Sequence, residues 1–500
     1  MKNKITLIIT LIVMNCFSQI PNVEWQYYYG GNSFDTVYDQ KQTPDGGYII
    51  VGVTNSSNIP NYHYNQEILL LKINSSGILE WQKSIGGDFN DNGTEIKIAS
   101  NGDYLISGGT ESNDYDFSFN RGQSDLFLMR VNPSGTILWQ RTYGGSNYDL
   151  ARNFIETPDG GFVIGGFSNS IDGDSNANNG SRDFWVIKTN SIGVLEWKKN
   201  YGGSDLDSLL EIIKTSDGGY IMTGETYSSN LPNYHGSSDV LVVKTDSTGN
   251  LIWQKCFGGS NWDYSSSIIE ASDGNFIIGA STQSFNHDVT SNHGGYFDFW
   301  VLKINPLGTI LWQKTYGGSN GEQISNIIET TDGNYIAIGL SDSTNGDLTS
   351  NNGGRDFWLV KISESGNLIW QKSLGVGTNE AANTIIQTSD GGYLVSGQTE
   401  NSGILGSDVW VIKLSNESLS TNDFSFEDKK IIISPNPVID YFKINNSKIT
   451  KVTIISLEGK ILKEFDSQEN YNISEFQKGT YLVKLLNDSN KVSITKIIKN

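Results

Sequence analysis

A repeated phrase constrains the fold of this chain more than any other feature of its sequence. Variants of Trp-Gln-Lys-x-Tyr-Gly-Gly occur seven times, at intervals of 56, 58, 58, 56, 59 and 58 residues. The seven tryptophans are Trp25, Trp81, Trp139, Trp197, Trp253, Trp312 and Trp370. A turn phrase of the Asp-Gly-Gly-Tyr type and a phrase of the Asp-Phe-Trp-Val-Ile-Lys type also occur seven times each. This self-similarity predicts a repeat architecture.

Each repeat unit predicts four short β-strands. In the third unit, β-branched and aromatic residues separated by turn residues occupy 153–157, 161–167, 183–189 and 194–201. Third strands such as Phe184-Trp185-Val186-Ile187 are continuously apolar, which is typical of a strand covered on both faces. Four-stranded sheets packed around an axis, as in a β-propeller, cover both faces of every sheet.

The phase of the repeat distinguishes a closed ring from an open stack. The repeating region begins with a single fourth strand at 23–29 and ends at Lys413, after a third strand. Together these fragments complete one unit, whereas an open solenoid needs separate polar caps. We therefore predict an all-β chain in which residues 19–414 form a seven-bladed β-propeller with four-stranded blades. The N-terminal strand is expected to close the last blade.

The repeat phrases also resemble known families of bacterial β-propeller repeats, the SBBP-like and Delta-60-like repeats. Gly-Gly-x-x-x-Asp, Asp-Gly-Gly-Tyr and Asp-x-Trp-x-x-Lys elements recur in those families. The resemblance covers about residues 22–414. It implies the propeller fold and no single activity.

The N-terminal segment predicts an exported protein. Residues 1–18 combine two lysines, an apolar run and short residues before a cleavage point, which is the pattern of a removed secretory signal peptide. Lipidation at Cys16 is an alternative, but the residues before it lack the small side chains of a lipidation site. No other apolar stretch approaches spanning length, so we expect no membrane span in the mature chain. Removal of the leader leaves Cys256 as one unpaired thiol.

The composition changes near the C-terminus. Residues 415–430 are polar and aperiodic, which predicts a linker. From 430 to 500 the chain contains 11 Lys, 7 acidic residues and no Trp. Short strands are expected at 431–433, 441–444, 451–456, 480–486 and 491–498. A segment of this size and pattern suits a small β-sandwich.

Four motifs in this segment resemble the type A C-terminal sorting domain of the type IX secretion system of Bacteroidota. They are Ser434-Pro435-Asn436-Pro437, Leu457-Glu458-Gly459-Lys460, the run from Lys478-Gly479-Thr480-Tyr481 to Lys484, and Thr495-Lys496-Ile497-Ile498-Lys499. The resemblance implies that residues 431–500 engage the type IX machinery, and that the propeller is secreted or displayed at the outer cell surface. The motif residues are Pro435, Asn436, Pro437, Gly459, Lys460, Gly479, Tyr481 and Lys496. A generic β-sandwich module is the alternative.

Seven acidic residues are the first candidates for a binding site. Each follows a Gly-Gly phrase, or its equivalent, by four residues, and they are Asp35, Asp91, Asp149, Asp207, Asp263, Glu322 and Glu380. In a propeller they could form a ring near the channel mouth, where Ca²⁺ would suit their oxygen atoms. The alternative is that each carboxylate caps its own loop by accepting backbone N–H groups. Sevenfold recurrence favours the alternative, because functional sites usually break the symmetry of a repeat.

Other candidate chemistry is sparse. Asp172, Asp174 and Asp347 are weak calcium candidates, because their loops lack the ligand spacing of an EF-hand. His63 and His235 lie in matching phrases on opposite sides of the predicted ring, so they cannot share a zinc ion. No Walker or His-Glu-x-x-His phrase occurs. We therefore predict no cofactor, with Ca²⁺ as the open alternative.

Charge and loop diversity favour a binding function. The net charge of −20 disfavours nucleic acid and anionic membranes as partners. The loops between second and third strands differ most among the units, and loops on a rigid scaffold commonly carry recognition. We expect a non-catalytic adhesion or binding protein whose loop face holds a glycan or a protein. The alternatives are an extracellular polysaccharide lyase or hydrolase with its site at the channel mouth, and a structural envelope component.

Overall fold

The computed structural model describes residues 20–175, 178–400, 406–417, 433–444, 448–456, 460–487 and 492–500. The predicted signal peptide, 1–18, and the part of the predicted linker from 418 to 430 lie outside these residues. The structured parts fall into a unit of Ile20–Asn416 and a unit that contains Glu417–Asn500. No α-helix occurs in the described residues.

The larger unit consists of seven antiparallel four-stranded sheets among its described residues. The first three blades are β2 (Asp35–Gln42), β3 (Tyr48–Thr54), β4 (Glu67–Ile73) and β5 (Leu79–Ile85); β6 (Asp91–Ile98), β7 (Tyr104–Thr110), β8 (Asp125–Val131) and β9 (Ile137–Tyr143); and β10 (Asp149–Glu156), β11 (Phe162–Ser168), β12 (Asp183–Thr189) and β13 (Leu195–Tyr201). The next three are β14 (Asp207–Lys214), β15 (Tyr220–Thr226), β16 (Asp239–Thr245) and β17 (Leu251–Phe257); β18 (Asp263–Glu270), β19 (Phe276–Thr282), β20 (Asp298–Ile304) and β21 (Ile310–Tyr316); and β22 (Glu322–Glu329), β23 (Tyr335–Ser341), β24 (Asp356–Ile362) and β25 (Leu368–Leu374). The seventh blade is β26 (Glu380–Gln387), β27 (Tyr393–Thr399), β28 (Asp408–Leu414) and β1 (Val23–Tyr29).

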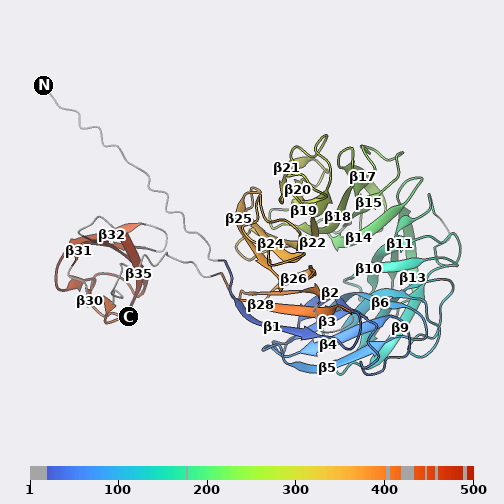
Figure 1. The fold of residues 1–500 in the computed structure, drawn as a ribbon, viewed down its shortest axis with the longest axis horizontal. Helices are drawn as coiled ribbons and strands as arrows, with labels where there is room; N and C mark the ends of the chain where they lie inside the picture. The colour runs from blue at the N-terminus through green and yellow to red at the C-terminus, as the bar shows by residue number, and fades with distance from the viewer. Residues whose placement is uncertain are drawn as a thin grey trace. The chain divides into compact units, whose positions relative to one another are not determined.

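The seven sheets form a closed ring. Figure 1 shows the first strand of each blade near the centre and the fourth strand at the perimeter. β1 pairs antiparallel with β28, so that Tyr28 lies opposite Trp410 and Tyr29 opposite Val409. The predicted seven-bladed propeller, closed by its N-terminal strand, is therefore confirmed.

The first strands are longer than the sequence pattern predicted. In the third blade the strand was expected at 153–157, but β10 spans Asp149–Glu156. The register between β10 and β11 shifts between Ala151 and Asn153, which places a β-bulge at Arg152. The bulge interrupts the alternation of buried and exposed residues, so periodicity reveals only the C-terminal half of the strand.

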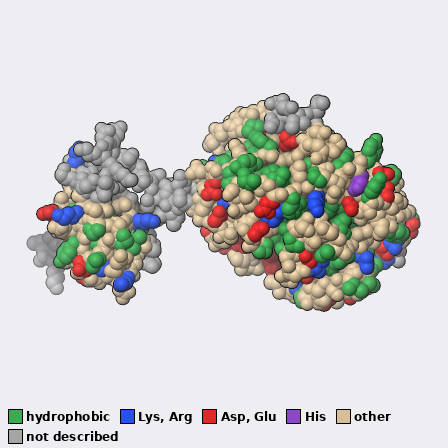
Figure 2. All heavy atoms as spheres, turned by 90° about the horizontal axis from the view of Figure 1, so that it is seen from below, with side chains coloured by type: hydrophobic (Ala, Val, Ile, Leu, Met, Phe, Trp, Pro, Cys, Tyr) green, Lys and Arg blue, Asp and Glu red, His purple; other side chains and the backbone are tan. Residues whose placement is uncertain are grey.

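The fourth strands form the half-exposed rim of the ring. β17, for example, has exposed residues at its start and buried residues only at its end. Figure 2 shows one face of the molecule, where acidic and basic side chains are scattered among hydrophobic and neutral polar ones. A rim of this kind presents no surface of a single charge sign on that face.

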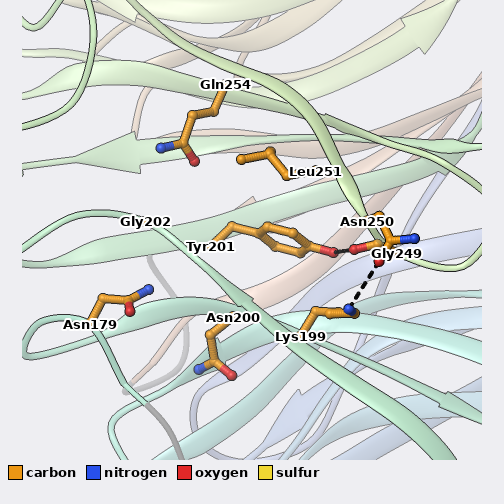
Figure 3. Close-up of a pocket in the computed structure, with 9 residues that line it drawn as sticks. All are labelled: Asn179, Lys199, Asn200, Tyr201, Gly202, Gly249, Asn250, Leu251 and Gln254. Atoms are coloured by element: carbon orange, nitrogen blue, oxygen red, sulfur yellow. Dashed lines mark hydrogen bonds between the residues drawn. The ribbon is translucent and has the colours of Figure 1, made fainter.

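A recurrent tyrosine hydrogen bond connects neighbouring blades at the rim. The hydroxyl of Tyr201, at the end of β13, donates to the carbonyl oxygen of Gly249 in the next blade at 2.6 Å (Figure 3). Lys199 donates to the side chain of Asn250 at 3.2 Å in the same groove. Matching tyrosine bonds join Tyr143 to Gly193 at 2.6 Å and Tyr316 to Gly366 at 2.8 Å.

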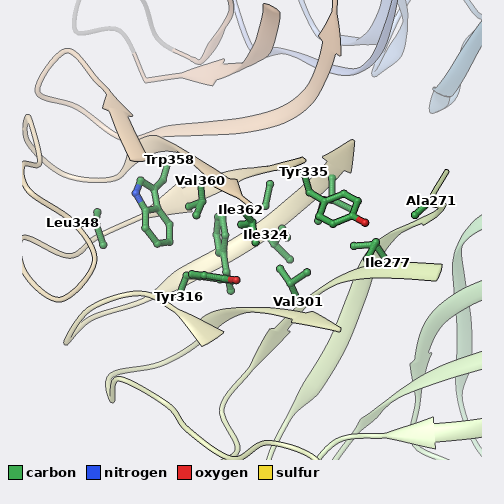
Figure 4. Packing of buried hydrophobic residues seen from close by; sticks show 13 residues of the cluster. Ala271, Ile277, Val301, Tyr316, Ile324, Tyr335, Leu348, Trp358, Val360 and Ile362 are labelled. Atoms are coloured by element: carbon green, nitrogen blue, oxygen red, sulfur yellow. The ribbon is translucent and has the colours of Figure 1, made fainter. Parts of the chain in front are cut away.

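The hydrophobic core lies between adjacent blades. Between the fifth and sixth blades, Trp358 of β24 packs against Phe299 of β20, with ring centroids 4.7 Å apart. Figure 4 shows this cluster, in which Val301 and Ile324 also lie. Tryptophans at the equivalent third-strand position are buried in three other blades: Trp185, Trp300 and Trp410. Such large aromatic surfaces supply much of the burial energy that holds the blades together.

The C-terminal unit is a small β-domain with two sheets. Its strands are β29 (Ile433–Ser434), β30 (Tyr441–Ile444), β31 (Ile449–Ile455), β32 (Ile461–Asp466), β33 (Tyr471–Asn472), β34 (Gly479–Asn487) and β35 (Val492–Lys499). The sheet orders are β29-β30-β33 and β32-β31-β34-β35. The sequence pattern did not predict β32, a mostly exposed edge strand, or the two-residue β33.

Candidate functional site

The mouth of the central channel contains a cavity of about 400 Å³. Every blade contributes the fourth residue of its first strand to the cavity wall: Tyr38, Thr94, Arg152, Leu210, Ser266, Ser325 and Asn383. In every blade the register shifts between the third and fifth residues of this strand, so the fourth is the bulged residue. Tyr264, Gln323 and Leu340 also line the cavity.

The cavity lies at the end of the channel that carries the diverse loops. Its lining residues come from the N-terminal halves of first strands and, in the case of Leu340, from the end of the second strand β23. In an antiparallel blade the second-to-third-strand loop leaves at that same end. The candidate site and the diverse loops therefore share one face of the propeller.

Two arginines approach the same phenylalanine at this end of the propeller, and of the two Arg152 lines the cavity. The Arg152 guanidinium carbon lies 5.7 Å from the centre of the Phe167 ring, and that of Arg182 lies 4.2 Å from the same ring. Arg182 donates to Asn169 at 3.0 Å and to Ser208 at 3.3 Å. The buried Nε of Arg152 has no hydrogen-bond partner among the described residues.

The electrostatics of the mouth are those of a partly desolvated cation pair with one counter-charge. Burial lowers the pKa of Arg152, and Arg182 lowers it further, whereas Tyr38 and Glu225 oppose the shift. Burial raises the pKa of Glu225, against the influence of both arginines. Burial also raises the pKa of Tyr264 to about 12, with a further contribution from Glu225. Two arginine cations therefore face one carboxylate in a partly desolvated site.

The seven candidate acidic residues do not face this cavity. Each is at most 1% exposed, and each accepts a hydrogen bond from the backbone N–H four residues earlier. In the third blade, the Oδ2 atom of Asp149 accepts from Gly145 N at 2.7 Å and from Ser170 Oγ at 2.7 Å. The expectation of a carboxylate ring at the channel mouth is therefore corrected. Each side chain is buried against the loop that precedes its own strand and accepts hydrogen bonds there, as the capping alternative predicts.

A second set of seven acidic residues lies beside the first set where neighbouring blades contact each other. These residues open the third strands: Glu67, Asp125, Asp183, Asp239, Asp298, Asp356 and Asp408. A Cβ atom on Gly144 would lie 2.3 Å from Asp125 Oδ1 and 2.8 Å from Asp149 Oδ2, so only glycine fits between these two carboxylates. Burial and the neighbouring Asp149 raise the pKa of Asp125 to about 6. The sequence showed both series, but it could not show that they pair across blades.

Basic side chains lie beside some of these pairs. Arg121 forms an ion pair with Asp174, and His293 lies 3.1 Å from Asp298 and 3.5 Å from Asp347. His63 lies 3.3 Å from Glu67 and stacks on Tyr115. Of these groups, Arg121 carries a permanent positive charge that partly balances the buried negative charge at its joint.

The weak calcium candidates belong to this blade contact. Asp172 Oδ1 accepts from Ser146 N at 2.7 Å, Asp174 Oδ2 from Gly144 N at 3.3 Å, and Asp347 Oδ2 from Gly317 N at 3.1 Å. Among the described residues, no group of three or more His, Cys, Asp or Glu side chains is arranged to hold a metal ion. These three side chains bind the Gly-Gly loop that precedes them in the chain.

The sorting-motif residues connect the first and last strands of the C-terminal unit. Asn436 donates to the Lys496 carbonyl at 3.1 Å and accepts from Ile498 N at 2.9 Å. Its neighbours Pro435 and Pro437 follow cis peptide bonds. Lys496 pairs with Leu482 across β34 and β35, and Tyr481 donates to the Gln477 carbonyl at 2.8 Å. Gly479 opens β34, Lys460 N lies 3.3 Å from Ser456 Oγ, and Gly459 lies outside the described residues.

The fold and these contacts define an all-β repeat protein with a separate C-terminal module. Residues 432–500 match the family model of the secretion system C-terminal sorting domain. This confirms the resemblance to the type IX sorting domain, so the chain is a type IX substrate that is exported to the cell surface or released. The described residues contain no helix long and apolar enough to span a membrane.

Three proteins to which this chain is similar share little sequence with it. Over 230 residues, 42% of this chain, the sequence is 21% identical to the regulatory protein FlaEY of Caulobacter vibrioides, and the match spans 24% of that protein. The extracellular domain of a hybrid two-component system of B. thetaiotaomicron matches with a TM-score of 0.40 at 10% identity, covering 95% of this chain and 59% of that one. Sqt1 from Chaetomium thermophilum matches with a TM-score of 0.41 at 8% identity, covering 80% of this chain and 100% of that one.

Proposed function

We propose that this exported propeller is a non-catalytic binding protein that holds a glycan or protein ligand at the mouth of its central channel. One observation carries the proposal: the fourth residue of the first strand is of six different types in the seven blades, with only Ser266 and Ser325 alike, while the acidic positions around it are uniform. Positions that build the blade repeat their residue type, so this variable ring is free to serve recognition.

A steric test examines the cavity without altering its charge. Leu210 lines the cavity, and Leu210→Trp would fill part of it. Leu251→Trp on the rim, where the native leucine is 49% exposed, is the matched control. The full-length protein is applied to a glycan array and to a pull-down from extracellular material. We expect Leu210→Trp to lose the ligands that wild type and Leu251→Trp retain. Equal retention by all three would refute a ligand site in the channel.

A second candidate function is an enzyme that acts on extracellular polysaccharide, as a lyase or a hydrolase. Tyr38 and Tyr264 line the cavity beside Arg152, and such groups could take part in proton transfer. Burial raises the pKa of both phenols, which opposes a phenolate base near neutral pH. Release of unsaturated or reducing ends from a polysaccharide, lost in Tyr264→Phe, would replace the binding proposal with this one.

A further inference from the structure

The channel mouth is a local excess of positive charge in an acidic protein. The chain has a net charge of −20, yet Arg152 and Arg182 converge on Phe167 with Glu225 as the nearby carboxylate. A half-buried cation pair of this kind is costly unless further anionic or polar partners complete it. The unpartnered Nε of Arg152 shows that the arginine retains unused hydrogen-bonding capacity.

Guanidinium groups have a defined preference among ligands. Their planar array of N–H donors matches the two oxygens of a carboxylate or a sulfate. Phe167 lies near both groups and limits their movement, while Asn169 and Ser208 hold Arg182 in place. Preorganised donors of this kind lose little entropy when an anion binds.

The remainder of the mouth favours a sugar over a peptide. Neutral hydroxyl and amide groups of Thr94, Ser266, Ser325, Gln323 and Asn383 line the wall. Thr94, Ser266 and Asn383 each donate to a backbone carbonyl of the next blade. Their oxygen atoms can still accept hydrogen bonds from sugar hydroxyls. Three exposed aromatic residues directly precede first strands at this end of the propeller: Phe34, Tyr148 and Trp262, which are 36%, 44% and 49% exposed. Flat exposed aromatic faces can pack on the C–H face of a pyranose ring.

We propose that Arg152 and Arg182 bind the acidic group of an anionic polysaccharide, with the sugar ring seated in the cavity at the channel mouth. This inference rests on the proposed binding function and names its ligand class. The acidic group is a carboxylate of a uronic acid or a sulfate ester, because both present oxygens to the guanidinium pair in the same way.

The test measures affinity of the full-length protein for three polymers: polygalacturonate, dextran sulfate and neutral dextran. We expect wild type to bind at least one acidic polymer and to bind dextran much more weakly. Arg152→Met and Arg182→Met should each weaken binding about tenfold. Arg152→Lys keeps the positive charge but lacks the planar guanidinium group, so its affinity should lie between those of wild type and Arg152→Met. Arg141→Met, on the rim strand β9, should match wild type.

Glu225→Gln separates a loss of ligand contacts from a loss of folding, because it is expected to strengthen binding. Removing this carboxylate leaves the arginines without their counter-charge, so binding of the acidic polymer should become about threefold tighter. Damage to the fold would weaken binding instead. Preference for polygalacturonate assigns a uronate, and preference for dextran sulfate assigns a sulfate ester.

Two results would overturn the inference and leave the binding function intact. One is equal binding of dextran and the acidic polymers, with no effect of Arg152→Met. The other is capture of a protein partner, lost in Leu210→Trp, by a propeller that binds none of the three polymers. If Leu210→Trp, Leu251→Trp and wild type retain every ligand equally, the proposed function fails as well.

Discussion

Deprotonation of a buried carboxyl group should make the propeller less stable as the pH rises. Asp239 opens β16 and is fully buried, its Oδ2 accepts from His235 N at 2.7 Å, and its Oδ1 has no partner. Burial, with contributions from Asp263 and Asp288, raises its pKa to about 7. The unfolded carboxyl titrates near 4, so the folded state binds the extra proton between about pH 4 and 7. Stability contributed by that proton is complete below the unfolded pKa and is lost as the pH rises through the folded pKa.

The perturbation is Asp239→Asn, which keeps the acceptor for His235 N and removes the titration. Between pH 5 and pH 7 the contribution of Asp239 to the free energy of unfolding falls by about 1.4 kcal/mol per pH unit, which amounts to about 3 kcal/mol. Urea unfolding at pH 5 and pH 8 should therefore show a pH dependence about 3 kcal/mol smaller in the variant than in wild type. The neighbouring groups that also face this joint are His235, which packs against His287, and the carboxylates of Asp263 and Asp288.

Asp217→Asn is the control, because it removes one carboxylate from the same blade outside the buried pair. Hydrogen bonds from Lys244 and Thr215 lower the pKa of Asp217 to about 2, so its titration is complete below pH 5. Parallel pH profiles for wild type and Asp239→Asn would refute the reasoning. A gain of about 3 kcal/mol on adding Ca²⁺ to wild type at pH 8 would refute it too, since a cation would then neutralise the pair.

Three further perturbations test the ring and its export. Trp358→Ala should cost about 3–5 kcal/mol in urea unfolding, because it opens the core between two blades, whereas Trp262→Ala at the exposed mouth should cost little; equal losses would contradict the assigned packing. Tyr201→Phe should cost about 1 kcal/mol through the lost bond to Gly249, compared with no loss in Tyr64→Phe on an exposed loop. Deletion of residues 431–500 should leave the propeller in the periplasm, on the inner side of the outer membrane, when cells are fractionated. Delivery of the propeller to the cell surface without this segment would exclude its sorting role.

The sequence was sufficient to predict the ring because the repeat region begins and ends within a unit, and the two partial units are complementary. A fourth strand at 23–29 supplies the strand that the last unit, which ends with its third strand near 413, does not contain. The structure pairs these two strands, β1 and β28. Third strands could be bounded closely, as in 183–189, because burial on both faces leaves a continuous apolar run. First strands could not, because the bulge at the fourth residue breaks the alternation.

The candidate site was beyond sequence reasoning for a physical reason. Arg152 comes from a first strand, Arg182 from a loop and Glu225 from a second strand of another blade, so no motif joins them. The recurring carboxylates attracted attention because they recur, yet recurrence marks residues that build every blade. The useful signal was the opposite one: the aligned position that holds Tyr38 and Arg152 varies among blades. Only the structure shows that this position is the bulged residue on the channel wall.

The pairing of β1 with β28 orders events during synthesis. Asn22 and Ser415, which are joined by a backbone hydrogen bond of 2.8 Å, lie 393 positions apart. β1, the first propeller strand in the chain, therefore stays without a strand partner until β28 of the last blade has been made. Unpaired edges invite misassociation, so a newly exported chain is most vulnerable during this interval. Closure of the ring therefore requires β28, the propeller strand that lies nearest in the chain to the sorting domain.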